Sequence, residues 1–178
     1  FLPNMPETVI SMLATASLGA VWTSCSPDFG VQGVLDRFGQ VEPKIFICVD
    51  GYYYNGKEFD CLEKNKKIVS QLPSLKNTLL VRFVNNSSEF LDLSQSFFFD
   101  EIISKPTNTD IEFESVAFND PLYILFSSGT TGVPKCIVHS VGGTLIQHKK
   151  EHMLHCDIKD GDKVFFFSTC GWMMWNWL

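Results

Sequence analysis

Residues 126–135 have the side-chain types of an anion site, in the order Phe-Ser-Ser-Gly-Thr-Thr-Gly-Val-Pro-Lys. Glycines let successive backbone N–H groups turn toward one point, hydroxyls add donors, and a lysine adds a compact positive charge. This composition indicates a site for a polyanion such as the triphosphate tail of a nucleotide. The residues that could contact it are Ser127, Ser128, Gly129, Thr130, Thr131, Gly132 and Lys135.

A flexible surface turn is the alternative reading of these residues, because serine, threonine and glycine are common in turns. The Walker pattern is absent, since the spacing is G-x-x-G-x-x-K and Pro134 precedes the lysine. The flanking runs 122–126 and 136–138 are rich in β-branched or aromatic residues, so both are predicted strands. The loop therefore joins two strands, and a helix dipole is not expected to be the main attraction for an anion.

Residues 127–135 resemble the phosphate-binding loop of the adenylate-forming superfamily, which contains acyl-CoA synthetases, peptide-synthetase adenylation domains and luciferases. Every position of the superfamily pattern is filled in this chain. Cys136 is a departure, because many members carry glycine there. The change leaves the charge of the loop untouched.

The resemblance implies a reaction in two halves. A carboxylate attacks the α-phosphate of ATP to give an acyl-adenylate and pyrophosphate, and the thiol of coenzyme A then displaces AMP. The implied cofactors are ATP, Mg²⁺ and coenzyme A, and the implied substrate is a small carboxylic acid. Lys135 is the implied catalytic residue, because its charge offsets the charge on the β- and γ-phosphates as pyrophosphate leaves.

Further stretches extend the resemblance over nearly the whole chain. Residues 2–7 and 18–21 resemble a synthetase helix and the segment after it, and 168–172 resemble the next signature of the acyl-CoA synthetases. The amino-acid sequences of 22–30 and 170–176 are most similar to those of the synthetases that activate acetoacetate. Acetyl- or propionyl-activating synthetases, and a short non-catalytic product that binds a nucleotide, remain alternatives.

Two pockets are implied only by position in the resemblance. Trp172, Met173 and Met174 are the candidates for the acyl pocket, with an ordinary hydrophobic core as the alternative. Residues 26–29 and Lys57 lie where acetyl-CoA synthetases hold coenzyme A, with solvated surface as the alternative.

Three histidines are spaced as metal ligands could be. His148, His152 and His155 fall on one face of a predicted helix. Lysines flank them and no second ligand cluster stands out, so no metal site is predicted. His139 follows the second strand and is expected nearer the nucleotide.

Composition excludes several partners. The chain has 178 residues, a formal net charge of -6 and no basic block, which disfavours nucleic acid and anionic membranes. The most apolar run, 164–178, is interrupted by polar residues and is shorter than the roughly 20 residues a membrane span needs. Six cysteines without a C-x-x-C pair or a secretory signal predict reduced thiols in the cytosol.

The order of predicted elements indicates an α/β fold with mostly parallel sheet covered by helices. Helices are expected at 6–18, 31–38, 59–72 and 142–155, and strands, besides the two at the loop, at 20–23, 45–49, 78–84 and 163–167. Residues 85–119 are expected to be irregular. The first helix should be capped by Asn4, stop at Gly19 and bury one apolar face; that face consists of Val9, Ile10, Leu13 and Ala16.

The ends of the chain suggest truncation, because it starts at Phe1 and stops inside an apolar stretch. We expect residues 1–178 to be a fragment of the large N-terminal AMP-binding domain that the resemblance implies. The small C-terminal domain, with its catalytic lysine, and the downstream signature with its Mg²⁺-binding glutamate are then absent.

Overall fold

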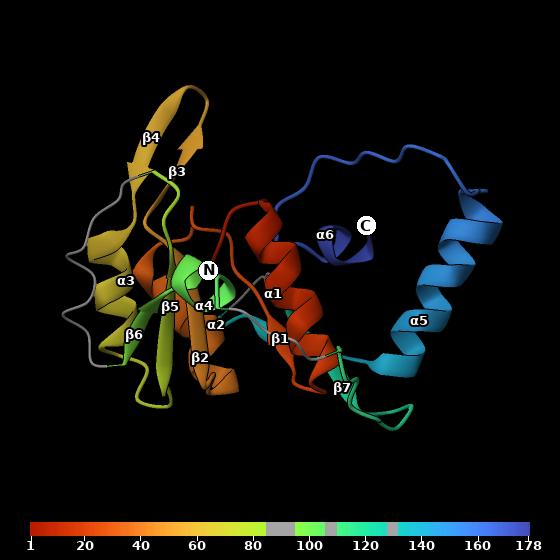
Figure 1. Ribbon diagram of the computed structural model, residues 1–178, viewed down its shortest axis with the longest axis horizontal. Helices are drawn as coiled ribbons and strands as arrows, with labels where there is room; N and C mark the ends of the chain where they lie inside the picture. Colours follow the sequence, from red (N-terminus) through yellow and green to blue (C-terminus); the bar gives the residue numbers. More distant parts are fainter. Residues whose placement is uncertain (85–94, 106–109, 128–131) are drawn as a thin grey trace.

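The computed structural model describes residues 1–84, 95–105, 110–127 and 132–178. In Figure 1 one half of the molecule contains strands β2, β5 and β6, the other contains β7, α5 and α6, and helix α1 lies between them. The described residues form two three-stranded sheets and one separate hairpin.

The first sheet is entirely parallel and has the strand order β2-β5-β6. Its strands are β2 (Ile45–Val49), β5 (Asn77–Val81) and β6 (Ser96–Phe98). Side chains alternate between two hydrophobic clusters along β2, because Phe46 and Cys48 belong to one cluster and Val49 to the other. The predicted α/β architecture with parallel strands is confirmed.

Two helices supply the larger of these clusters. Helices α2 (Val31–Val41) and α3 (Leu62–Val69) contribute Val34, Phe38 and Ile68, all at most 3% exposed. The burial of these side chains fixes both helices to the sheet.

A hairpin shortens the helix that we predicted at 59–72. Strands β3 (Gly51–Tyr54) and β4 (Lys57–Asp60) pair antiparallel, so Phe59 faces Tyr52 and the helix begins only at Leu62. The turn is Asn55-Gly56, and both residues have positive φ angles of 49° and 72°. Asn-Gly is the preferred pair for a two-residue turn of this kind, so a local signal for the hairpin was present.

The second sheet contains the two strands at the predicted anion loop. Strand β1 (Trp22–Thr23) pairs parallel with β7 (Pro121–Ser127), and β7 pairs antiparallel with β8 (Lys135–Ser140). Both flanking strands are thus confirmed.

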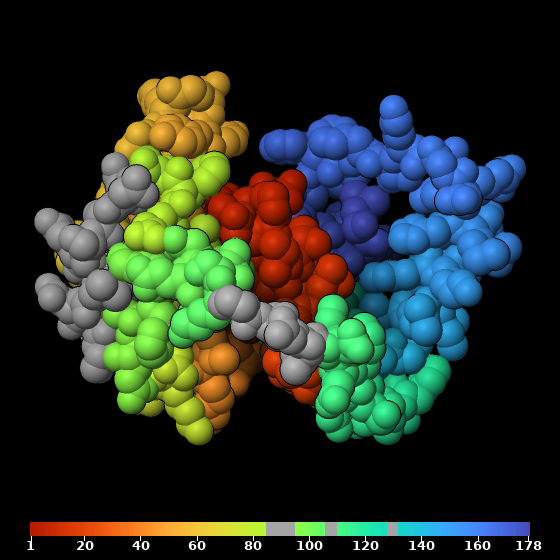
Figure 2. Space-filling model, viewed as in Figure 1, coloured from red at the N-terminus to blue at the C-terminus, as the bar shows by residue number. Residues whose placement is uncertain are grey.

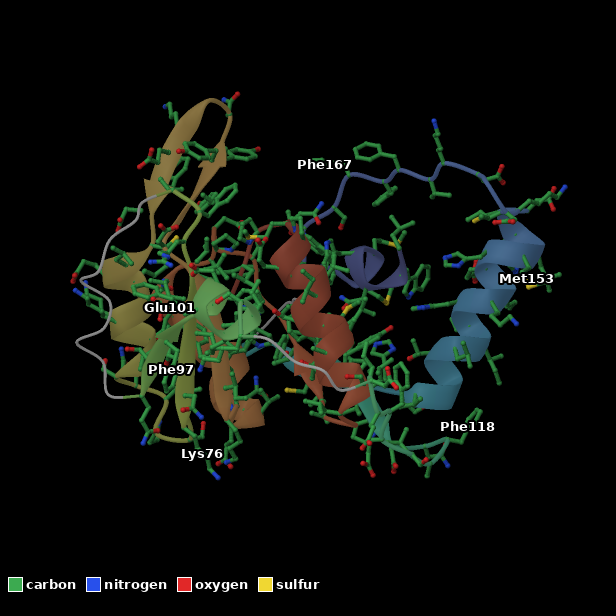
Figure 3. The ribbon with its side chains drawn as sticks, viewed as in Figure 1. Lys76, Phe97, Glu101, Phe118, Met153 and Phe167 are labelled. Carbon is green, nitrogen blue, oxygen red and sulfur yellow. The ribbon has the colours of Figure 1, made fainter. Side chains whose placement is uncertain are left out.

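Helix α5 (Val141–Lys150) follows β8 directly and continues as a π-helical segment, η2 (Glu151–His155), which agrees with the helix predicted at 142–155. Ser140 caps α5, since its Oγ accepts a hydrogen bond from the Gly143 amide at 3.3 Å. Phe118 lies at the start of this helix (Figure 3), and a Cβ at Gly142 would come within 2.1 Å of the Phe118 ring. Glycine at 142 is what allows this contact.

Helix α1 (Pro6–Ser17) forms where predicted, but its expected cap and buried face are wrong. Met5 occupies the N-cap position without a side-chain hydrogen bond, while Asn4 Oδ1 accepts from Trp175 Nε1 at 2.9 Å. The helix buries Thr8 and Ser11 and leaves its apolar face exposed. Periodicity identifies an apolar face, but it does not determine what that face contacts.

Two other predictions are wrong. Within 85–119, β6 pairs with β5 and helix α4 (Phe99–Ile103) follows it, so this segment is partly regular. Residues 163–167 form no strand in the described structure, and Phe167 is 77% exposed and projects outward in Figure 3. A short last helix, α6 (Met173–Trp177), completes the chain.

No helix in the described ranges combines the length and apolar character that crossing a bilayer requires.

Candidate functional site

The two strands hold the ends of the predicted anion loop opposite each other. Ser127 is the last residue of β7, Lys135 is the first of β8, and the ladder pairs them directly. Gly132 has a φ of 125°, a conformation that favours glycine. The middle of the loop, namely Ser128, Gly129, Thr130 and Thr131, lies outside the described residues.

Lys135 is exposed at this end of the hairpin. Its ammonium group makes no ion pair within the part of the chain that the structure describes. An exposed lysine beside a hydroxyl-rich loop is able to contact a phosphate oxygen.

Residues 168–172 lie against the turn at 26–29. A Cβ on Gly171 would approach the Ser26 amide nitrogen and the Phe29 ring, both at 3.3 Å. The thiol of Cys170 donates to the Leu2 carbonyl at 2.7 Å, and the Cys170 carbonyl accepts from the Ser24 hydroxyl. The predicted coenzyme A turn and the acyl-CoA synthetase signature are therefore neighbours.

Arg37 of α2 links this region to the anion loop. Its guanidinium lies 4.4 Å from the centre of the Phe29 ring and 6.0 Å from the centre of the Phe126 ring. Phe126 directly precedes Ser127 in β7. One side chain thus connects the turn at 26–29 with the strand that leads into the loop.

A cavity of about 340 Å³ opens beside the signature. Its lining residues are Phe166, Phe167, Ser168, Thr169, Trp172 and Met174. Two of the three predicted acyl-pocket residues line it, and Met173 does not. Sequence reasoning missed the two phenylalanines as lining residues, because it assigned them to a strand.

No described contact joins Lys57 to the turn at 26–29 or to the signature at 168–172. It is exposed at the start of β4, where it pairs with Tyr54 at the tip of the hairpin. Figure 1 shows this hairpin projecting from the body of the molecule.

A second cavity, of about 310 Å³, lies between the β7–β8 hairpin and helix α5. Its lining residues are Tyr123, Val138, His139, Ser140, Gly143, Thr144, Gln147, His148 and Trp177. Along β8, His139 is four residues from Lys135, roughly 13 Å at the usual rise of a strand. The position of His139 near a nucleotide stays a prediction.

The polar groups of this second cavity are only partly paired. His139 Nε2 is buried and has no hydrogen-bond partner among the described residues. The Tyr123 hydroxyl lies 3.5 Å from His148 Nε2. Burial lowers the pKa of both His139 and His148 below the ordinary value of 6.5, so both rings are neutral at pH 7. The sequence placed His139 near the nucleotide, whereas His148 was considered only as a possible metal ligand.

The histidine face of the helix forms no metal centre in the described structure. His148 and His152 have ring centres 6.1 Å apart. Within the described ranges, no group of three or more His, Cys, Asp or Glu side chains is arranged to hold a metal ion.

The sequence profile of one family, described as AMP-binding enzyme, matches residues 1–177. The chain belongs to the AMP-binding enzyme family. Proteins with similar sequences include the acetoacetyl-coenzyme A synthetase of Rhizobium meliloti (strain 1021), 54% identical over 99% of this chain. The malonamoyl-CoA synthetase of Penicillium aethiopicum is 45% identical over the full chain.

The fold of this chain also matches a solved structure. The acetoacetyl-CoA synthetase from Streptomyces lividans aligns with a TM-score of 0.93 and 43% identity over the whole chain. The chain covers 27% of that protein, 27% of the Rhizobium relative and 25% of the Penicillium relative. It therefore spans about a quarter of the length of the relatives it matches.

Proposed function

We propose that the full-length protein containing this chain is an ATP-dependent acid–thiol ligase that converts acetoacetate and coenzyme A to acetoacetyl-CoA, AMP and pyrophosphate. The single observation that carries the proposal is the 54% identity, over 99% of this chain, with a protein named acetoacetyl-coenzyme A synthetase. In this proposal residues 1–178 are part of an N-terminal AMP-binding domain, and the C-terminal domain lies outside the chain.

The anion loop acts in the first half-reaction. A carboxylate and a triphosphate are both negative, so their repulsion opposes adenylate formation. Lys135 and the loop N–H groups stabilise the charge that builds on pyrophosphate as it leaves. The phosphate oxygens are oriented by the hydroxyl groups of four loop residues: Ser127, Ser128, Thr130 and Thr131. Gly129 and Gly132 allow the loop backbone to approach the phosphates. A hydrogen bond to a charged group contributes about 1.5–3 kcal/mol.

Mg²⁺ normally accompanies ATP, and the described residues contain no group of three or more His, Cys, Asp or Glu side chains arranged to hold a metal ion. Oxygen ligands, including the phosphates of the nucleotide, are those that Mg²⁺ prefers. One or two protein carboxylates complete such a set, and the resemblance implies that a glutamate of the downstream signature, beyond residue 178, supplies one of them.

The acid is proposed to bind in the cavity beside the signature. Trp172 and Met174 give this cavity apolar lining, and Ser168 and Thr169 also line it. A small acid with one polar group beyond its carboxylate fits a wall of mixed character. Met173 is a neighbour of this wall and not part of its lining.

Coenzyme A is proposed to approach along the turn at 26–29, which contacts the signature through Gly171. Lys57 is the less supported contact, because it lies at the tip of a separate hairpin. The six cysteines are free thiols, which supports the proposed location in the reducing cytosol.

The test is acid-dependent exchange of labelled pyrophosphate into ATP by the full-length protein, with acetoacetate, malonamate, acetate and propionate compared. We expect exchange with acetoacetate to have the highest kcat/KM. A preference for malonamate or acetate would replace the proposed acid, and absence of exchange with all four would leave the non-catalytic alternative.

The same assay tests the loop. Lys135→Ala should slow adenylation about 10²-fold, as loss of one stabiliser of developing charge does elsewhere. Lys149→Ala is the control, because Lys149 is an exposed lysine on α5, away from the loop. A loss below tenfold for Lys135→Ala in single-turnover adenylation excludes the proposed role.

A further inference from the structure

Gln40, near the C-terminal end of α2, contacts the loop segment on both sides of Lys135. Its side-chain amide donates to the Pro134 carbonyl at 2.8 Å and to the Asp36 carbonyl of its own helix at 2.6 Å. Its carbonyl oxygen accepts from the Cys136 thiol at 3.5 Å. One exposed side chain thus contacts both the residue before and the residue after Lys135. These two contact partners are 94 and 96 residues from Gln40 in the sequence.

The helix that carries Gln40 is itself fixed in place. Val34 and Phe38 are 0% and 3% exposed in the main core, and Phe38 is only two residues before Gln40. Arg37, on the adjacent turn of α2, contacts the Phe126 ring of the opposite strand. Helix α2 therefore meets both strands of the hairpin at the end where the loop begins and ends.

The direction of these contacts leaves the lysine accessible. Successive side chains of a strand point to opposite faces. Cys136, which meets Gln40, therefore points away from the face that Lys135 presents. A contact on the far face can set the position of the strand without covering the ammonium group.

We propose that Gln40 is a positioning residue for the first half-reaction, holding the Pro134–Cys136 segment so that Lys135 faces the departing pyrophosphate. This inference rests on the proposed function and adds a residue that no loop motif contains. Pyrophosphate has left before the thiol attacks. The contact should therefore matter for adenylate formation and not for transfer of the acyl group to coenzyme A.

The test uses the full-length protein with three variants. Gln40→Leu removes both donors and the acceptor at similar size, Gln40→Glu keeps an acceptor but removes the donors, and Gln32→Leu is the matched control. Gln32 is an exposed glutamine of the same helix whose amide donates to the Asp36 carboxylate and does not touch the loop. Each variant is measured in pyrophosphate exchange and in the conversion of a chemically prepared acyl-adenylate to the CoA thioester.

We expect Gln40→Leu and Gln40→Glu to slow exchange about tenfold, because misplaced catalytic groups lose rate steeply with distance. Thioester formation should stay within about twofold of the wild type, and Gln32→Leu should match the wild type in both assays. In a Lys135→Ala background, Gln40→Leu should have little additional effect, since the two residues act as one unit. Equal slowing of both half-reactions, or full exchange activity in both Gln40 variants, overturns the inference.

A second measurement separates this inference from the proposed function. Amide hydrogen exchange of residues 135–138 should become faster in Gln40→Leu than in Gln32→Leu, whatever reaction the protein catalyses. If the wild type shows no acid-dependent exchange, the proposed function fails while the hydrogen-exchange comparison still tests the contact. If the amides of both variants exchange alike, the contact does not hold the strand and the inference fails.

Discussion

At the scale of single residues, the six free thiols divide into two groups. Cys136 and Cys156 are exposed, whereas the other four, Cys25, Cys48, Cys61 and Cys170, are buried. Burial raises the pKa of Cys25 to about 12 and the pKa of Cys61 to about 11. Because the thiolate is the reactive form, burial protects these thiols both by limiting access and by keeping them protonated.

Alkylation with iodoacetamide at pH 8, followed by peptide mapping, should therefore label Cys136 and Cys156 in the native full-length protein. The four buried cysteines should be labelled only after denaturation. ATP with Mg²⁺ should leave the labelling of both cysteines unchanged, because Cys136 points away from the face that Lys135 presents. Rapid labelling of Cys25 or Cys48 in the native protein would contradict the burial described here.

At the scale of elements, His139 and His148 line the cavity where α5 packs on the β7–β8 hairpin. Burial lowers the pKa of His139 and His148, so the folded state binds protons less readily than the unfolded state. The stabilising contribution of the neutral rings is present above the ordinary pKa of about 6.5 and is lost as the pH falls below it.

Lowering the pH from 7.5 to 5.5 should therefore lower the protection factors of the α5 amides in the full-length protein, that is, the ratios of the intrinsic exchange rate to the measured rate at each pH. A double variant, His139→Gln with His148→Gln, cannot titrate at these positions and should show a smaller decrease. His155→Gln serves as the control, because His155 is exposed in η2. An unchanged pH response in the double variant would mean that the packing does not depend on these rings.

At the scale of the whole molecule, residues 141–178 expose many large apolar side chains. Phe165, Phe167 and Leu154 are 87%, 77% and 77% exposed. Figure 2 shows the surface hollowed between α5 and the extended segment that leads to α6. Apolar exposure on this scale marks an interaction surface. Since the chain spans about a quarter of its relatives' length, we propose that other parts of the full-length protein cover it.

The 178-residue chain by itself should therefore bind a hydrophobic dye such as ANS more strongly, per mole, than the full-length protein. Replacing Phe165 and Phe167 by serine should reduce the dye fluorescence of the short chain and lower the melting temperature of the full-length protein. Replacement of Phe113, exposed in a different segment, is the comparison. Equal dye binding by the short and full-length chains would show that the surface stays uncovered.

The sequence predicted what is encoded locally. Strand β2 has the predicted bounds, and the strand-loop-strand order around Ser127 and Lys135 is correct, because short apolar runs and punctuating glycines are local signals. The buried face of α1 and the missing strand at 163–167 were wrong, because both depend on which other segments pack there. Gln40 carries no local signal for its role, since its contacts with Pro134 and Cys136 lie more than 90 residues away in sequence.

The pairing of Trp22 with Tyr123 has a consequence for how the chain folds as the ribosome makes it. Strands β1 and β7 are separated by about 100 residues, and the whole β2-β5-β6 sheet with α2 and α3 lies between them in sequence. The intervening sheet can form while β7 is still unsynthesised, because domains fold as units from the N-terminal side. The partner that orients Lys135, helix α2, is thus expected to be in place before the loop leaves the ribosome.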